Sequence, residues 1–143
     1  MSEQTEIKSC CVSGHLHSGT PQGKFEDLHG LKTYVTGSGK DTIVFIPDIF
    51  GIYPNAQLLA DTWAQEGGWR VLIPDVFQGD AVPLEHLNLI APPLPILNKR
   101  TPDQAKEDGA KTMELLGPWL GKHSEANVLP LIQNFFKGVK NDG

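Results

Sequence analysis

The chain has 143 residues, a length that suits one domain and is too short for two of ordinary size. Hydrophobic residues make up 39% of it and charged residues 20%, so it can build a core and is not compositionally disordered. A net charge of −5 with no cluster of lysine or arginine argues against nucleic-acid binding, and the short apolar runs argue against a membrane span. Because the first nine residues are polar and contain no secretory signal, we expect a soluble, cytoplasmic globular protein.

The first elements in chain order are a loop and a hairpin. Residues 1–22 are rich in turn-forming residues and show no periodicity, which predicts an N-terminal loop segment. Lys24–Leu28 and Leu31–Thr36 predict two short antiparallel strands. A tight turn at His29-Gly30 joins them, because glycine accepts a positive φ.

A strand–helix–strand unit follows. Residues 42–46 form a continuous β-branched and aromatic run, typical of a strand buried on both faces. A helix is predicted from Pro54 to Gly67-Gly68, and residues 70–73 form a second apolar strand. The apolar stripe of this helix, expected to face the core, is Ala56, Leu59, Ala60, Trp63 and Ala64. This order predicts a parallel βαβ unit and an α/β fold.

The C-terminal half predicts a loop and two helices. Residues 79–100 contain four prolines and predict an irregular loop. Thr101-Pro-Asp-Gln104 resembles a capping box and opens a helix expected to end at Leu116, before a Gly-Pro pair. Ser124 is expected to cap a last helix, which Pro130 should kink or whose first turns it should end. Its apolar stripe is Val128, Ile132, Phe135 and Val139.

Two aspartates follow the two apolar strands of the βαβ unit. Ile46-Pro-Asp-Ile-Phe50 and Ile73-Pro-Asp-Val-Phe77 match at four of five positions, which places Asp48 and Asp75 at the sheet edge where α/β proteins bind ligands. The two carboxylates could hold Mg²⁺ or share acid–base work, or each could cap the turn that follows it. We favour capping, with one aspartate lining a pocket, because the sequence places no third oxygen ligand beside them.

Other motifs do not support a metal or a cofactor. Cys10 and Cys11 are adjacent, and adjacent thiolates chelate poorly, so with His15 and His17 they are not expected to bind zinc. The glycine–lysine pairs of the chain lack the spacing of a phosphate-binding loop.

A nucleophile elbow is also missing from the sequence. No serine or cysteine has a glycine two positions before it and another two positions after it. In α/β hydrolases the acid and the histidine follow the nucleophile, so none of the five histidines is placed to be the base. These histidines are His15, His17, His29, His86 and His123.

Three stretches together carry a resemblance to a known family. They are the N-terminal Cys-Cys-x-Ser-Gly-x-x-His-x-Gly-Thr-Pro-x-Gly run, Ile-Pro-Asp-Ile-Phe-Gly with Asn55 and Leu59-Ala-Asp61, and the segment from Val71 to Asp80. The chain resembles the dienelactone hydrolases of the branch common in fungi. The resemblance implies an α/β hydrolase with a cysteine nucleophile, an aspartate and a histidine, which opens lactones or small esters through an acyl-enzyme.

The resemblance also implies roles for single residues. The backbone N–H of Ile49 matches the position that supplies half of the oxyanion hole. Asp48 stands where bacterial relatives have a glutamate facing the resting cysteine, and Phe50 and Phe77 would line the pocket. Gln78-Gly-Asp80 stands where those relatives have an arginine for the substrate carboxylate.

The cysteine elbow, the acid and the base of the family would lie after residue 143. We therefore expect residues 1–22 to be an N-terminal segment and residues 23–143 to be a partial α/β-hydrolase domain without its elbow half. The expected partner is a small ester or lactone, with no cofactor, metal, nucleic acid or membrane. We also expect residues 42–46 to form an open sheet edge, which should leave the chain marginally stable, self-associating through that edge, or dependent on a partner.

Two other interpretations stay open. The chain could be a catalytically inactive α/β module that binds a small molecule or a protein. A flavodoxin-like domain is less favoured, because no phosphate loop follows either apolar strand.

Overall fold

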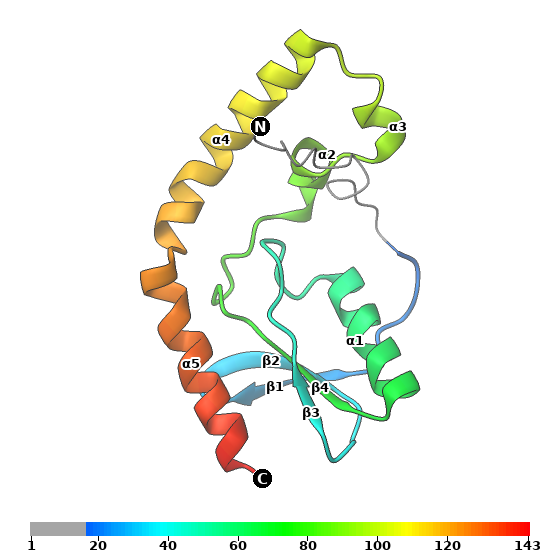
Figure 1. Ribbon diagram of the computed structural model, residues 1–143, viewed down its shortest axis with the longest axis vertical. Helices are drawn as coiled ribbons and strands as arrows, with labels where there is room; N and C mark the ends of the chain where they lie inside the picture. Colours follow the sequence, from blue (N-terminus) through cyan, green and yellow to red (C-terminus); the bar gives the residue numbers. More distant parts are fainter. Residues whose placement is uncertain (1–16) are drawn as a thin grey trace, which may run out of the picture. The chain divides into compact units, whose positions relative to one another are not determined.

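A computed structural model describes residues 17–143 of the chain (Figure 1). These residues fall into two compact units: residues 83–119 form the smaller one, and residues 17–82 with residues 120–143 form the larger one. Within residues 17–143, no helix has the length and apolar character needed to cross a membrane.

The larger unit is built on a four-stranded mixed sheet with the strand order β1-β2-β4-β3 (Figure 1). β1 (Lys24–Leu28) and β2 (Leu31–Thr36) form an antiparallel hairpin, and β2 pairs antiparallel with β4 (Arg70–Pro74). β3 (Thr42–Val44) pairs parallel with β4. The predicted hairpin, the parallel strand pair and the α/β class are all confirmed.

Two details of the sheet follow from the backbone. His29 and Gly30 have φ of 49° and 83°, so the tight turn between β1 and β2 is where the sequence predicts it. β3 is shorter than the five residues predicted for it, although the N–H of Phe45 still bonds the carbonyl of Leu72 at 2.8 Å.

Helix α1 (Pro54–Gly67) covers one face of the sheet. It begins with proline at its first position and ends at Gly68, whose φ of 66° reverses the chain, as the sequence predicts. Ala60 packs at its centre with no exposed surface. The buried core between α1 and the sheet is Tyr34, Ala56, Ala60, Ala64, Val71 and Ile73.

The predicted stripe of α1 is wrong at one position. Leu59 is 43% exposed, whereas Asp61 is only 5% exposed. The reason is that the Asp61 carboxylate accepts two hydrogen bonds, which remove the cost of burying its charge.

Helix α5 (Glu125–Asn141) covers the other face (Figure 1). Side chains alternate along β3, so Ile43 packs toward α1, whereas Val44 lies beside Phe136 of α5. Phe135 is fully buried and meets His29 edge-on at 5.8 Å. The other three residues of the predicted stripe, Val128, Ile132 and Val139, are half-buried.

The ends of α5 differ partly from expectation. Ser124 occupies the N-cap position, as predicted, but its side chain makes no capping hydrogen bond. Pro130 does not end the first turns, and the helix continues through it. A proline in the second turn removes a single N–H, and water can satisfy the carbonyl left without a partner on this exposed side.

The smaller unit contains short helical turns and the start of a long helix. Within the stretch predicted as an irregular loop lie η2 (Leu84–His86), α2 (Leu87–Ile90) and α3 (Leu94–Leu97). Helix α4 (Pro102–Lys122) begins with the predicted capping box: Gln104 N–H donates to Thr101 Oγ1 at 3.2 Å, and Thr101 N–H donates to Gln104 Oε1 at 3.0 Å.

The predicted end of this helix at Leu116 is wrong, because α4 runs on to Lys122 with Pro118 inside it. Proline lacks the N–H that would bond the carbonyl of Glu114. Glu114, Gly117 and Pro118 are all exposed, so water can take the place of that N–H.

Candidate functional site

The loop after β3 is fixed by one carboxylate. Asp48 Oδ1 accepts the N–H of Phe50 at 2.9 Å, and Asp48 Oδ2 accepts the hydroxyl of Tyr53 at 3.0 Å. The N–H of Gly51 closes the turn onto the Asp48 carbonyl at 2.9 Å. Burial, then the charge of Asp48, raises the pKa of Tyr53 to about 12, so the phenol stays protonated and remains a donor.

Ile49 lies at the centre of this loop. Its carbonyl accepts the N–H of Val82 at 2.8 Å, which ties the loop to the chain beyond β4. Gly51 has φ 68°, and a Cβ there would lie 2.8 Å from the Cβ of Ala81, so the loop packs closely. Within residues 17–143 the N–H of Ile49 donates no hydrogen bond. One amide of a rigid loop is therefore left for another acceptor.

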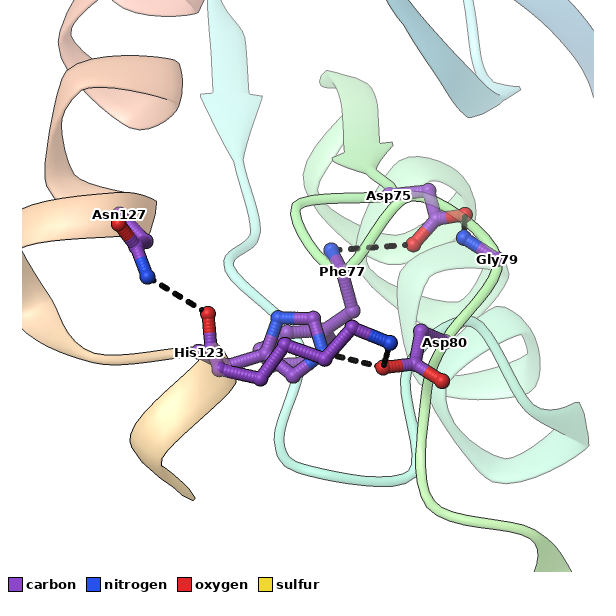
Figure 2. Close-up of polar contacts among 7 residues, drawn as sticks. Asp75, Phe77, Gly79, Asp80, His123 and Asn127 are labelled. Carbon is purple, nitrogen blue, oxygen red and sulfur yellow. Dashed lines mark hydrogen bonds and ion pairs between the residues drawn. The ribbon is translucent and has the colours of Figure 1, made fainter. Parts of the chain in front are cut away.

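The loop after β4 repeats this arrangement (Figure 2). Asp75 Oδ1 accepts the N–H of Phe77 at 3.2 Å, and Oδ2 accepts the N–H of Gly79 at 2.8 Å. The sequence echo at Asp48 and Asp75 is therefore also a structural echo, and the capping interpretation of both residues is confirmed.

Within residues 17–143 no three histidine, cysteine, aspartate or glutamate side chains are grouped so as to hold an ion. Cys10, Cys11 and His15 lie outside the described residues.

Figure 2 shows a polar cluster that the sequence did not predict. Asp80 Oδ2 lies 2.7 Å from His123 Nε2 and 2.7 Å from Lys122 Nζ. The ring of Phe77 meets the His123 ring edge-on at 5.3 Å, and Asn127 Nδ2 donates to the Lys122 carbonyl at 2.8 Å. The cluster links the loop after β4 to the start of α5. Because Asp80 and His123 lie 43 residues apart, no local pattern could have found the pair.

The electrostatics of this cluster centre on Asp80. The hydrogen bond from Lys122, and next that from His123, lowers the pKa of the Asp80 carboxyl below its usual value. At neutral pH Asp80 is therefore ionised.

A pocket of about 940 Å³ lies beside α1 in the larger unit. We call it the α1 pocket. Its walls come from residues 17–22, from the chain after β3, and from one side of α1. The described residues that line it are His17, Ser18, Gly19, Thr20, Gln22, Phe45, Ile46, Pro47, Asp48, Tyr53, Asn55, Ala56, Leu58, Leu59, Asp61, Thr62 and Gln65.

Of the four predicted site residues, one lines the α1 pocket and three are not among its described lining residues. Asp48 lines it. Phe50 and Phe77 are each 8% exposed and pack edge-on against Tyr53 and His123, and neither they nor Ile49 is among the described lining residues. Their roles toward a substrate stay predictions.

Backbone N–H groups of residues 17–22 bond side chains of α1. The N–H of His17 donates to Asn55 Oδ1 at 2.7 Å, and the N–H of Gln22 donates to Asp61 Oδ2 at 2.8 Å. Asp61 Oδ1 accepts the Tyr34 hydroxyl at 2.9 Å, and the hydroxyl oxygen accepts the N–H of Gly23 at 2.7 Å. Burial raises the pKa of Tyr34 to about 12. Two residues of the family resemblance, Asn55 and Asp61, therefore hold residues 17–22 against α1.

Comparison with known proteins finds relatives of part of the chain. It is 40% identical over 82 residues to the hydrolase pyvD of Aspergillus violaceofuscus and 39% identical over 82 residues to the hydrolase tropI of Talaromyces stipitatus. It is also 36% identical over 78 residues to dienlactone hydrolase 1 of Gibberella moniliformis.

These matches cover between 51% and 54% of this chain and between 30% and 33% of the three relatives. No family model and no solved structure matches the chain. About half of this chain is therefore homologous to fungal dienelactone hydrolases and related hydrolases, over about a third of their length.

Proposed function

We propose that this chain carries the N-terminal part of a carboxylic ester or lactone hydrolase of the dienelactone hydrolase type. The observation that carries the proposal is the loop after β3, where Ile49 keeps a backbone N–H available in a turn that Asp48 and Val82 hold rigid. The partial homology to named hydrolases supports the same assignment. In this proposal residues 1–22 are an N-terminal segment, and residues 23–143 are a partial catalytic domain.

The Ile49 amide would act when the ester carbonyl becomes tetrahedral. Attack by a nucleophile places a negative charge on the carbonyl oxygen, and an N–H already aimed at that oxygen stabilises the charge without reorganising. The nucleophile, acid and base would come from outside these 143 residues. The family resemblance also assigns Asp48, Phe50 and Phe77 to the substrate pocket, and of these three Asp48 lines the α1 pocket.

A chimera tests the assignment. In it, the 78-residue stretch of this chain that matches dienlactone hydrolase 1 replaces its counterpart there, so that the rest of that protein supplies the remaining groups. We expect the chimera to hydrolyse p-nitrophenyl acetate with saturable kinetics. This chain alone should give only the background rate, because an oxyanion donor without a nucleophile has no attack to assist.

The control is a chimera with a sequence-scrambled insert of the same length. A folded chimera with no turnover above that control would contradict the proposal. Saturable turnover by the isolated chain would contradict the idea that the catalytic groups lie elsewhere.

The α1 pocket favours a second candidate, an inactive module that binds a small molecule. Its volume of about 940 Å³ is within the range of small-molecule sites. The two candidates differ in the chimera assay, since a binding module predicts no turnover there.

A further inference from the structure

The described lining of the α1 pocket contains two acidic side chains. Asp48 and Asp61 line it, and none of its described lining residues is lysine or arginine. His17 is the one other ionisable side chain among them apart from Tyr53. A ligand in this pocket therefore meets two carboxylates.

Asp48 and Asp61 differ in whether they can accept a hydrogen bond from a ligand. The Asp61 oxygens accept the N–H of Gln22 and the hydroxyl of Tyr34, and because the residue is only 5% exposed, burial keeps a ligand from adding a further donor, so Asp61 contributes charge alone. Asp48 is exposed, and each of its oxygens accepts one donor. Because an ionised carboxylate has about four acceptor sites, Asp48 can accept a hydroxyl from a ligand.

The rest of the wall is partly apolar. Phe45 and Leu58 are half-buried, and Ile46 and Leu59 are 36% and 43% exposed. A small molecule that covers these side chains would remove apolar surface from water, which favours binding. A suitable ligand thus combines an apolar ring with a hydroxyl group and carries no negative charge.

We propose that the α1 pocket binds an uncharged lactone or ester that bears a hydroxyl group, and that Asp48 and Asp61 select against carboxylate-bearing analogues. The choice of a lactone or ester rests on the proposed function above. The charge preference rests on the pocket alone.

Binding to the 143-residue chain tests the preference without any turnover. The probes are 6-hydroxycoumarin-3-carboxamide and 6-hydroxycoumarin-3-carboxylate, two lactones of nearly equal shape that differ by one negative charge at about pH 7.5, which is above the ordinary histidine pKa. Chemical shifts of the pocket amides report binding. We expect the carboxamide to shift the amides of residues 45–48 and α1, and the carboxylate to bind at least about five-fold more weakly, since one like charge a few ångströms away has roughly that effect even in water.

Two matched variants identify the source of the preference. Asp48→Asn removes one charge from the pocket and should reduce the difference between the probes by about half or more on a logarithmic scale, roughly the share of one of two carboxylates. Asp75→Asn removes the equivalent charge from the loop after β4, outside the pocket lining, and should leave the difference unchanged.

Equal or tighter binding of the carboxylate would overturn the proposal, and so would failure of the carboxamide to shift these amides at millimolar concentration. Either result would leave the oxyanion role of Ile49 intact, because the chimera assay measures that role separately. Conversely, a chimera without turnover alongside the expected charge preference would reject the hydrolase assignment and keep the pocket.

Discussion

Aspartate side chains accept hydrogen bonds that fix two loops and one helix of the larger unit. Some of these hydrogen bonds could be predicted from the sequence, and others could not. The turns at Asp48 and Asp75 follow from sequence, because each carboxylate bonds the N–H two residues later. Asp61 bonds partners 27 and 39 residues away, so helical periodicity alone placed the wrong residue, Leu59, in the core. Short-range hydrogen bonds leave a sequence pattern, whereas long-range ones do not.

Replacing Asp61 tests its structural role. Asp61→Ala leaves the Tyr34 hydroxyl and the Gln22 N–H without their acceptor, and we expect the free energy of unfolding to fall by roughly 2–4 kcal/mol. Urea unfolding followed by circular dichroism measures the change. The control is Asp27→Ala in β1, an exposed position whose replacement should have little effect. Equal losses for the two variants would show that Asp61 is not a structural anchor.

The two tyrosines of the chain provide a pH test. Burial raises the pKa of both Tyr34 and Tyr53 to about 12, from 10.0. The folded state therefore favours the protonated phenols, and this stabilisation is present below about pH 10 and is lost as the pH rises through about 12. Ultraviolet titration should show tyrosinate forming near pH 12 in the native protein and near pH 10 in denaturant. Ionisation of either tyrosine near pH 10 in the native protein would contradict the environment described for it.

The ends of helices were predicted correctly where residues adjacent in the sequence determine them. The capping box at Thr101 and the start and end of α1 are local signals, and each lies where the sequence places it. The end of α4 was predicted wrongly because Pro118 is exposed, and water can satisfy a carbonyl that a buried helix would leave unpaired. The link from α5 to the loop after β4 was not predicted, because Asp80 and His123 meet only through tertiary structure.

The Asp80 link should depend on pH. The hydrogen bonds from Lys122 and His123 lower the pKa of Asp80 below 3.8 in the folded state, so the link stabilises the protein above about pH 3.8 and is lost as the pH falls through that lower value. Asp80→Asn should lower the urea midpoint at about pH 6, with a smaller difference from the unmodified chain at about pH 2.5.

Glu114→Gln, at an exposed position in the middle of α4, is the control for this pH dependence. Its effect should not follow the Asp80 pattern, because Glu114 is neither part of the cluster nor in the first helical turn, where the helix dipole favours an ionised carboxylate. A difference between Asp80→Asn and the unmodified chain that grows toward low pH would mean that the sign of the Asp80 contribution is wrong.

For the molecule as a whole, the family resemblance predicted that β3 lies at the sheet edge beside β4, and the consequence of that position can be measured. β3 is at the edge of the described sheet, as expected. Asp41 and Phe45 bond β4, so the alternating backbone groups of Thr42 and Val44 point to the open edge. Beside them lies a groove of about 390 Å³ that includes Phe136 and Val139 of α5. An open edge of this kind pairs readily with another strand.

We therefore predict that the 143-residue chain self-associates through β3. Sedimentation velocity should show an average mass that rises with concentration. Thr42→Lys places a charge on the exposed edge and should weaken the association, because edge lysines oppose strand pairing. Gln133→Lys adds the same charge on an exposed part of α5 and serves as the control. A chain that stays monomeric at all concentrations would exclude this use of the β3 edge.

If the N–H of Ile49 stabilises the oxyanion of an ester hydrolase, removing that N–H alone must lower the rate of hydrolysis. In the active chimera, Ile49→Pro removes the N–H, whereas Ile49→Ala keeps it and shortens the side chain. Loss of one oxyanion donor reduces kcat by roughly 10²–10³, so we expect a loss of that size for Ile49→Pro and less than about ten-fold for Ile49→Ala, with both variants folded by circular dichroism. Equal kcat values for the two variants would contradict the assignment of Ile49 to the oxyanion hole.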